Sequence, residues 1–161
     1  MEGDPGVIAF LNTALRNELT AINQYFLHSR MLADWGVSEL AKKEYAESVD
    51  EMKHADNLIQ RVLFLGGLPN LQDIGKLLIG ENLKEVIACD LALEKSALPD
   101  LHKAIAHCEK VGDYVSRELF VSILKSEEGH IDFLQTQFRL IEQMGIENFV
   151  QLQTKPNTTG I

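Results

Sequence analysis

Two Glu-x-x-His pairs are the residues in this sequence whose types and spacing are best suited to chemistry. They are Glu51 with His54 and Glu127 with His130. Residues three positions apart lie on the same face of an α-helix, so each pair would present a carboxylate and an imidazole side by side. Carboxylate oxygens and imidazole nitrogens bind first-row transition metals. Either pair alone is a weak indication, because Glu and His also occur at this spacing by chance.

A repeat in the chain makes a metal site the stronger interpretation. Three residues recur 76 positions later, which gives the pairs Glu18 and Glu94 (94 − 18), Glu51 and Glu127 (127 − 51), and His54 and His130 (130 − 54). One helix with Glu followed by one with Glu-x-x-His, repeated once, is the ligand pattern of ferritin-like di-iron bundles. Two Fe(II) ions would balance four carboxylates. Open oxygen and nitrogen ligation also suits redox-active iron better than closed structural zinc.

Turn and capping patterns divide the chain into the helices that must position these residues. The pairs Asp-Pro, Asn-x-x-Glu and Gly-Asp are typical of helix starts and stops. The predicted long helices run from Asp4-Pro5 to Trp35-Gly36, from a Ser38 cap to Gly66-Gly67, from Asn82 with Glu85 to Gly112, and from Asp113 to Gly145. Each holds about 28 to 30 residues, roughly 42 to 45 Å of helix. Pro99 is expected to kink or break the third one locally.

The segment between the second and third helices predicts the topology. Its 16 residues, Gly66 to Glu81, reach at most about 53 to 58 Å, enough to run the length of a bundle. The second and third helices can then be parallel, as in ferritins. We therefore predict an all-α, ferritin-like four-helix bundle in one domain over residues 1–161, with the core bundle at about 5–144, a short fifth helix at about 146–152 and a frayed tail at 153–161.

The helical register predicts that most of the acidic residues at issue are buried. Glu18, Glu94 and Glu127 lie in the middle of apolar stripes, where an unpaired carboxylate is costly and is normally paired or bound to metal. Glu51 is less clear, because the residues before it on the same face are polar, namely Glu44, Glu47 and Ser48. That half of the second helix either faces solvent or forms a polar approach to the site, and the pattern favours solvent.

Composition limits the classes of function. The formal net charge of −9 argues against a nucleic-acid partner, and no apolar run approaches the ~20 residues that span a bilayer. The start of the chain has no pattern of a signal peptide, so a cytoplasmic location is expected. Cys89 and Cys108 form no CxxC motif. On one helix they would lie roughly 28 Å apart, too far to pair, so two free thiols are expected.

The sequence resembles the bacterioferritins over essentially its whole length. The stretches that carry the resemblance are NELTAINQYFLHSRMLADWG, ESVDEMKHAD, FLGGLPNLQ, ACDLALE, DYVSRELF and SEEGHIDFLQTQ. It implies a ferroxidase that oxidises Fe(II) with O2 or peroxide, bridging roles for Glu51 and Glu127, and a hollow shell of 24 subunits that stores ferric mineral. The implied ligands of the two irons are Glu18, Glu51, His54, Glu94, Glu127 and His130.

The resemblance also implies haem b, shared by two subunits, with Met52 of each as axial ligand. The register allows this, because Met52 points about 100° away from Glu51 around the helix. A small iron-sulfur ferredoxin would dock over the haem for iron release, with the region from Leu68 to Asn70 and Glu81 as expected contacts. Whether the subunit assembles alone or with a second subunit type is left open.

One position departs from the family pattern. Some members bind iron on the inner surface with His at position 46 and Asp at 50, but this chain has Ala46 with Asp50. Iron would then pass through the centre itself, with a mobile His130 as a gate. The rival interpretations are a haem-free ferritin, another di-iron enzyme such as a rubrerythrin-like peroxidase, and a bundle without redox chemistry.

Several polar residues have no partner in the repeat. Tyr25 shares the face of Glu18 and either contributes to the site by electron donation or hydrogen bonding, or packs in the core. Asp90, one turn before Glu94, is expected to support a ligand. The remaining histidines are interpreted as surface or interface residues: His28, His102 and His107.

Overall fold

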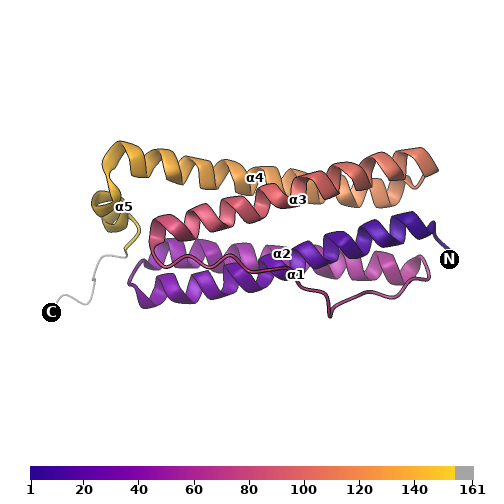
Figure 1. Cartoon of the computed structure of the whole chain (residues 1–161), viewed down its shortest axis with the longest axis horizontal. Helices are drawn as coiled ribbons and strands as arrows, with labels where there is room; N and C mark the ends of the chain where they lie inside the picture. The colour runs from indigo at the N-terminus through magenta and orange to yellow at the C-terminus, as the bar shows by residue number, and fades with distance from the viewer. Residues whose placement is uncertain (155–161) are drawn as a thin grey trace.

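The protein is an elongated bundle of four long helices with a short helix at one end (Figure 1). The computed structural model describes residues 1–154. Most of the predicted tail, residues 155–161, lies outside the described residues. The helices are α1 (Pro5–Asp34), α2 (Ser38–Phe64), α3 (Leu83–Val111), α4 (Tyr114–Met144) and α5 (Ile146–Leu152). The described residues contain no strand. The all-α, ferritin-like fold class is confirmed.

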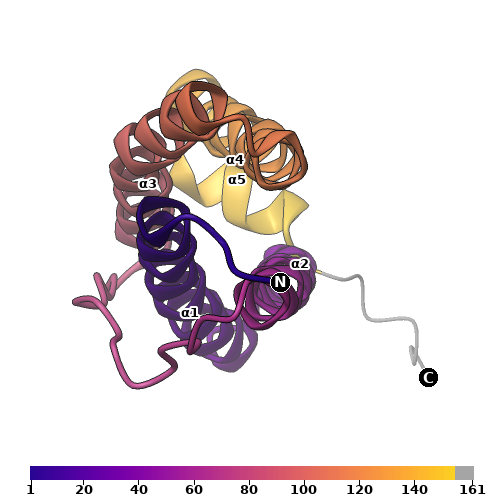
Figure 2. The ribbon, with the colours of Figure 1, turned by 90° about the vertical axis from the view of Figure 1, so that its right-hand side faces the viewer.

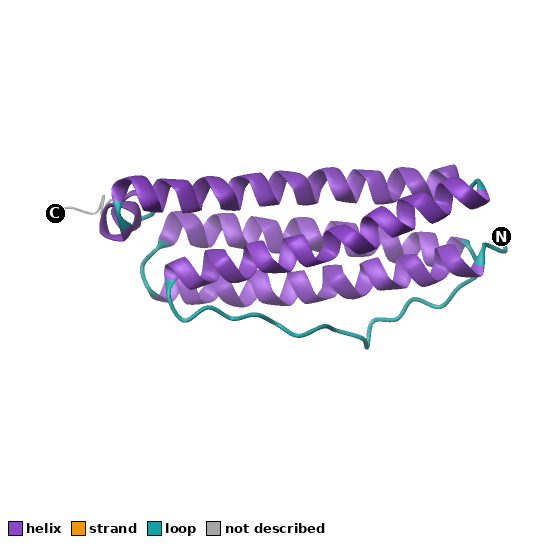
Figure 3. Ribbon diagram, turned by 45° about the horizontal axis from the view of Figure 1, so that its top comes forward, coloured by secondary structure: helices purple, strands orange, loops and turns teal. Residues whose placement is uncertain are grey.

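The chain direction of the helices confirms the predicted topology. Helices α1 and α2 form one antiparallel pair and α3 and α4 another (Figure 1), and the end view shows how the helices pack around the bundle axis (Figure 2). The segment between α2 and α3 runs along the outside of the bundle (Figure 3), which makes these two helices parallel. None of the helices in residues 1–154 is long and apolar enough to cross a lipid bilayer.

The helix boundaries follow the capping patterns with two exceptions. Asn82 caps α3 by accepting a hydrogen bond from the Glu85 amide at 2.9 Å, and Gly112 ends α3 in the left-handed region at φ 77°. Ser38, predicted as a cap, is instead the first residue of α2, and Val37 occupies the cap position. Pro99 does not break α3, which continues through it, and the alternative of a kink at Pro99 stays a prediction.

A row of residues on α1, spaced four apart, holds the long crossover against the bundle. Thr20 Oγ1, Gln24 Oε1 and His28 Nε2 accept hydrogen bonds from the backbone amides of Gly75, Leu78 and Gly80, at 2.8, 2.9 and 3.0 Å. Asn12 and Arg16 extend the row through contacts with Asn70 and Asp73. Because residues four apart lie on one helix face, a single face of α1 fixes the path of the crossover.

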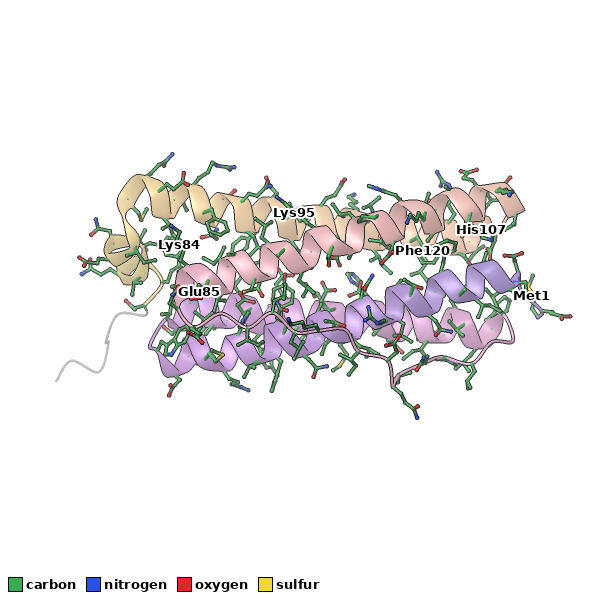
Figure 4. All side chains as sticks on the ribbon, viewed as in Figure 1. Met1, Lys84, Glu85, Lys95, His107 and Phe120 are labelled. Atoms are coloured by element: carbon green, nitrogen blue, oxygen red, sulfur yellow. The ribbon has the colours of Figure 1, made fainter. Side chains whose placement is uncertain are left out.

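Two apolar clusters leave a polar layer in the middle of the bundle. One cluster contains Leu15 and Phe120, which projects between the helices in Figure 4. The other contains Leu32 and Leu134, and Phe149 of α5 closes it with no exposed surface. In α1 and α4 the ligand candidates fall between the two clusters, so packing on both sides fixes their positions.

Candidate metal centre

All six residues that the repeat predicts meet in the polar layer. They form two groups whose donor atoms all lie within 4.8 Å of one another. The first group contains one histidine from α2, and the second contains one from α4. The members are Glu18, Glu51, His54 and Glu127 in the first group and Glu51, Glu94, Glu127 and His130 in the second.

Glu51 and Glu127 belong to both groups, and each directs its two oxygens to different histidines. Glu51 places Oε2 at 3.7 Å from His54 Nδ1 and Oε1 at 3.1 Å from His130 Nδ1. Glu127 places Oε1 at 3.8 Å from His54 Nδ1 and Oε2 at 3.8 Å from His130 Nδ1. A carboxylate oriented in this way can contact two metal ions at once.

The terminal members complete each group on its own side. Glu18 Oε1 lies 3.5 Å from His54 Nδ1, and Glu94 Oε1 lies 3.3 Å from His130 Nδ1. Two ligand atoms bound at right angles to one ion, each at about 2.0 to 2.2 Å, are about 3 Å apart. The spacing of the donor atoms therefore fits an ion between the members of each group.

Unsatisfied polar atoms also point to a ligand. Glu18 Oε2, Glu51 Oε1, Glu127 Oε1 and His54 Nδ1 are buried without a hydrogen-bond partner. The three carboxylates are at most 4% exposed. Buried polar atoms without partners cost on the order of 1 to 3 kcal/mol each. Cations bound between them would remove this cost.

Burial and mutual repulsion shift the ionisation of the centre. Burial, together with the charge of Glu51, raises the pKa of Glu18 well above its usual value. Burial raises the pKa of Glu94 to about 7. Burial opposes ionisation of Glu51 too, but the Glu18 carboxyl group and the His130 and His54 rings beside it lower its pKa to about 2. Without metal, the centre thus holds protons at positions where cations would bind.

The polar half of α2 is buried, so the prediction that it faces solvent is wrong. Glu44, Glu47 and Ser48 are 3%, 6% and 5% exposed. Ser48 Oγ donates to the Ile22 carbonyl of α1 at 2.9 Å. Glu47 contacts His130 Nε2 and accepts from Lys43 at 3.0 Å. The polar face of α2 packs against polar groups of other helices, and the sequence of α2 alone does not predict these contacts.

Glu47 forms a further group with Asp50 and His130, with donor atoms within 4.8 Å. His130 lies between this group and the centre, since its Nδ1 faces Glu51 while its Nε2 faces Glu47. Hydrogen bonds with Glu47, Glu51 and Glu94 outweigh the effect of burial and raise the pKa of His130 to about 12. Ala46 supplies no donor atom here.

Tyr25 contributes to the site rather than only to the core. Its hydroxyl donates to Glu94 Oε1 at 2.5 Å, and the side chain is 1% exposed. Burial, with the charge of Glu94, raises the pKa of Tyr25 well above its usual value, so the hydroxyl keeps its proton. This hydrogen bond orients Glu94 within the second group.

The structure corrects the interpretation of one histidine. His28 is fully buried and pairs with Asp90, Nδ1 to Oδ1 at 2.8 Å, so it is not a surface or interface residue. His102 is exposed. His107, near the start of α1 in Figure 4, contacts Asp4 at 2.7 Å. Asp90 accepts hydrogen bonds from Gln24 and His28 of α1, and it does not support Glu94 in this way. The spacing of four along α1 is the pattern that could have found His28.

Comparison with known proteins decides the family. The family profile described as a Ferritin-like domain matches residues 8–144. Bacterioferritin from Rhodobacter capsulatus is 50% identical over 156 residues, which cover 97% of both chains. Bacterioferritin from Brucella melitensis biotype 1 is 51% identical over 156 residues, again 97% of both. The chain belongs to the bacterioferritin family.

A third relative extends the match to the full length of a curated protein. Bacterioferritin BfrA from Mycobacterium tuberculosis is 47% identical over 159 residues, 98% of this chain and 100% of that protein. A small cavity is lined by Ser96, which is exposed on α3, and by Glu18, Glu51 and Glu127 of the centre. The cavity therefore joins an exposed residue to three members of the centre.

Proposed function

We propose that this bacterioferritin oxidises Fe(II) to Fe(III) at a di-iron centre formed by six residues: Glu18, Glu51, His54, Glu94, Glu127 and His130. The observation that supports this most directly is the orientation of the two shared carboxylates, each with one oxygen toward each histidine. Iron storage is the general role that family membership gives the chain. The ferroxidase step supplies the Fe(III) that is stored.

Charge compensation explains how the residues would drive iron binding. Four buried carboxylates repel one another, and two Fe(II) ions neutralise them while displacing the protons held by Glu18, Glu94 and His130. Each iron then gives one electron to O2 or peroxide. Tyr25 holds Glu94 in place through its hydroxyl, and the cavity near Ser96 is the proposed access path.

His130 is proposed to control where Fe(III) goes next. Its two ring nitrogens face different acidic groups, with Glu51 on one side and Glu47 on the other. A rotation of the ring would exchange contacts with the centre for contacts with Glu47 and Asp50. This arrangement favours transit through the centre toward the interior of the shell. His130 at full occupancy in one position, in crystals of both redox states soaked in Fe(II), would contradict a gate.

Haem b is proposed to bind where two subunits meet, and Met52 of each subunit would hold it. The site fits in this chain, because Met52 is 58% exposed on α2, two turns after Tyr45. The Tyr45 ring is 45% exposed and contacts the Phe26 ring, which is 46% exposed. A thioether on such a face can contact a haem only if a second surface covers it, as a two-fold interface would. Bound haem would supply one-electron redox chemistry for iron release.

Assembly and release complete the proposal. Subunits would form a shell of 24, either alone or with a second subunit type, and a small iron-sulfur ferredoxin would deliver electrons for release. Leu68, 83% exposed on the crossover, and Glu81, also exposed, are available for docking. A particle near 24 times 18.1 kDa by size-exclusion chromatography is expected. A monomer or dimer would refute storage in a shell.

Aerobic Fe(II) oxidation by purified protein tests the central step. The Glu127→Ala variant should lose rapid oxidation because both irons lose a shared ligand. Glu118→Ala, a change at a side chain that is 72% exposed on the same helix, is the matched control. Equal rates in all three proteins would remove the ferroxidase assignment. A haem absorption band that disappears in Met52→Leu separates this protein from a haem-free ferritin.

A further inference from the structure

A second buried polar cluster lies beside the metal centre and shares none of its six residues. It joins His28 of α1, Glu44 of α2 and Asp90 of α3, whose donor atoms lie within 4.8 Å of one another. His28 and Asp90 have no exposed surface, and Glu44 is 3% exposed. Two carboxylates at this depth require either a proton or a cation between them.

The hydrogen bonds of His28 show that it is not a metal ligand here. The Gly80 amide donates to His28 Nε2 at 3.0 Å, so Nε2 carries no proton. Nδ1 therefore carries the proton and donates it to Asp90 Oδ1 at 2.8 Å. Both nitrogens are thus in use. Gln24 Nε2 donates to the same oxygen at 3.0 Å, so Asp90 Oδ1 accepts two hydrogen bonds.

The other oxygens of the two carboxylates have no N–H donor. Asp90 Oδ2 and Glu44 Oε2 are buried, and neither atom has an N–H or hydroxyl donor. A single proton would satisfy both atoms, with Glu44 as a carboxylic acid that donates to Asp90. Burial, followed by the charge of Asp90 and the hydrogen bond to it, raises the pKa of Glu44 well above its usual value.

A small cavity connects Glu44 with the metal centre. Tyr25, Glu44, Glu47 and His130 line it together with Lys43, Phe133 and Leu134. Its space is on the order of one water molecule, and its polar lining offers several hydrogen-bond partners to such a water. The cavity thus provides a path for a proton between Glu44 and the side of the centre where His130 lies.

We propose that Glu44 and Asp90 share one buried proton and that Glu44 passes it through this cavity to the oxidant at the metal centre. This role rests on the proposed ferroxidase function. Two Fe(II) release two electrons, and O2 takes up two electrons and two protons to form hydrogen peroxide. Peroxide likewise takes up two electrons and two protons to form two water molecules. Glu44 supplies one proton, solvent supplies the other, and Glu44 is reprotonated from solvent afterwards.

Electrostatics links the proton to the oxidation state of the irons. Oxidation adds two positive charges to the centre, and departure of the proton leaves one more negative charge on the Glu44–Asp90 pair. Opposite charges at this depth attract strongly, so oxidation of the irons favours departure of the proton.

The titratable and charged groups around Glu44 come from all four long helices. They are Tyr25 and His28 of α1, Lys43 and Glu47 of α2, Asp90 and Glu94 of α3, and His130 of α4.

Infrared difference spectroscopy on the metal-free assembled protein tests the shared proton without any activity. The Glu44→Gln variant should lose one carbonyl band of a protonated carboxylic acid. The amide of this variant can still donate to Asp90, so the fold is expected to remain intact. Glu118→Gln, at an exposed side chain, is the matched control and should leave that band unchanged. A Glu44→Gln spectrum that loses only ionised-carboxylate bands would overturn the shared proton.

Kinetics and metal counting test the proton transfer itself. The Glu44→Gln variant should bind two Co(II) per subunit, as the parent protein does. It should oxidise Fe(II) roughly tenfold to a hundredfold more slowly, because a positioned proton donor typically accelerates a reaction by about a hundredfold or more. Its solvent isotope effect should differ from that of the parent protein. An unchanged rate and isotope effect would refute the relay. A third Co(II) per subunit that Glu44→Gln abolishes would show a cation in place of the proton.

The two proposals fail in different ways. The ferroxidase function, and with it the proton transfer, would be refuted if the parent protein bound no Co(II) at the six ligands or did not oxidise Fe(II). The infrared band would still decide whether Glu44 and Asp90 share a proton. Normal Fe(II) oxidation in Glu44→Gln would refute the proton transfer alone.

Discussion

Replacing a shared ligand should cost more metal-induced stability than replacing a terminal ligand. Glu127 and Glu94 are a matched pair for this comparison, since both are carboxylates only 3% and 2% exposed. Glu127 directs one oxygen to each histidine, whereas Glu94 lies near His130 alone. The variants Glu127→Gln and Glu94→Gln therefore remove contacts with two ions and one ion respectively.

The size of the effect follows from binding linkage. An ion present at 100 times its dissociation constant stabilises the folded protein by about 2.7 kcal/mol, so two ions add about 5 kcal/mol. Since 1 kcal/mol raises the melting temperature by about 2 to 4 °C in a chain of this size, metal loading should raise it by roughly 10 to 20 °C. Glu127→Gln should lose nearly all of this gain, and Glu94→Gln about half.

Thermal unfolding under anaerobic conditions, with and without Co(II), measures these gains without oxidation of the metal. Without metal, neither variant should be less stable than the parent protein, because each removes a buried carboxylate that neighbouring carboxylates repel. Co(II) titration followed by its visible absorption counts the ions that remain bound. Equal losses of metal-induced stability in the two variants would refute the shared role of Glu127.

Three further predictions concern stability. Burial holds the pKa of Glu94 at about 7 against an ordinary value of 4.5; the folded metal-free protein therefore binds more protons than the unfolded chain, and its stability should fall as pH rises across this range. Denaturant unfolding at several pH values should show this slope reduced in Glu94→Gln. Asn82→Ala should cost about 1 kcal/mol in denaturant unfolding, because the Asn82 side chain caps α3. Phe120→Ala should cost about 3 to 5 kcal/mol by the same measurement, because it would open a cavity where Phe120 has no exposed surface. A cost below 1 kcal/mol for Phe120→Ala would contradict its place in the core.

The sequence predicts the six residues of the centre because their pattern lies along the chain. The spacing of three positions places Glu51 and His54 on one helix face, and the 76-residue repeat carries the same arrangement into the second helix pair. The sequence also predicts the crossover, because the length of the segment between α2 and α3 allows these helices to be parallel. These features depend on distances in sequence and not on which side chains meet across helices.

The residues that sequence reasoning misplaces depend on contacts between helices. Glu44 belongs to a polar run on α2 that is typical of a solvated face, but it lies opposite Asp90 of α3 and is buried. His28 has no counterpart in the repeat, and its partners come from the crossover and from α3. Ser38 has the residue type of a cap, but the chain turns one residue earlier, at Val37.

Anomalous diffraction from crystals of the assembled protein, soaked anaerobically in Fe(II), would locate the bound ions. We predict two iron peaks per subunit, about 3.5 to 4 Å apart as in two-metal sites. Glu51 and Glu127 should each contact both ions, with His54 on one and His130 on the other. A single peak, or two peaks that share neither carboxylate, would contradict a di-iron centre bridged by Glu51 and Glu127.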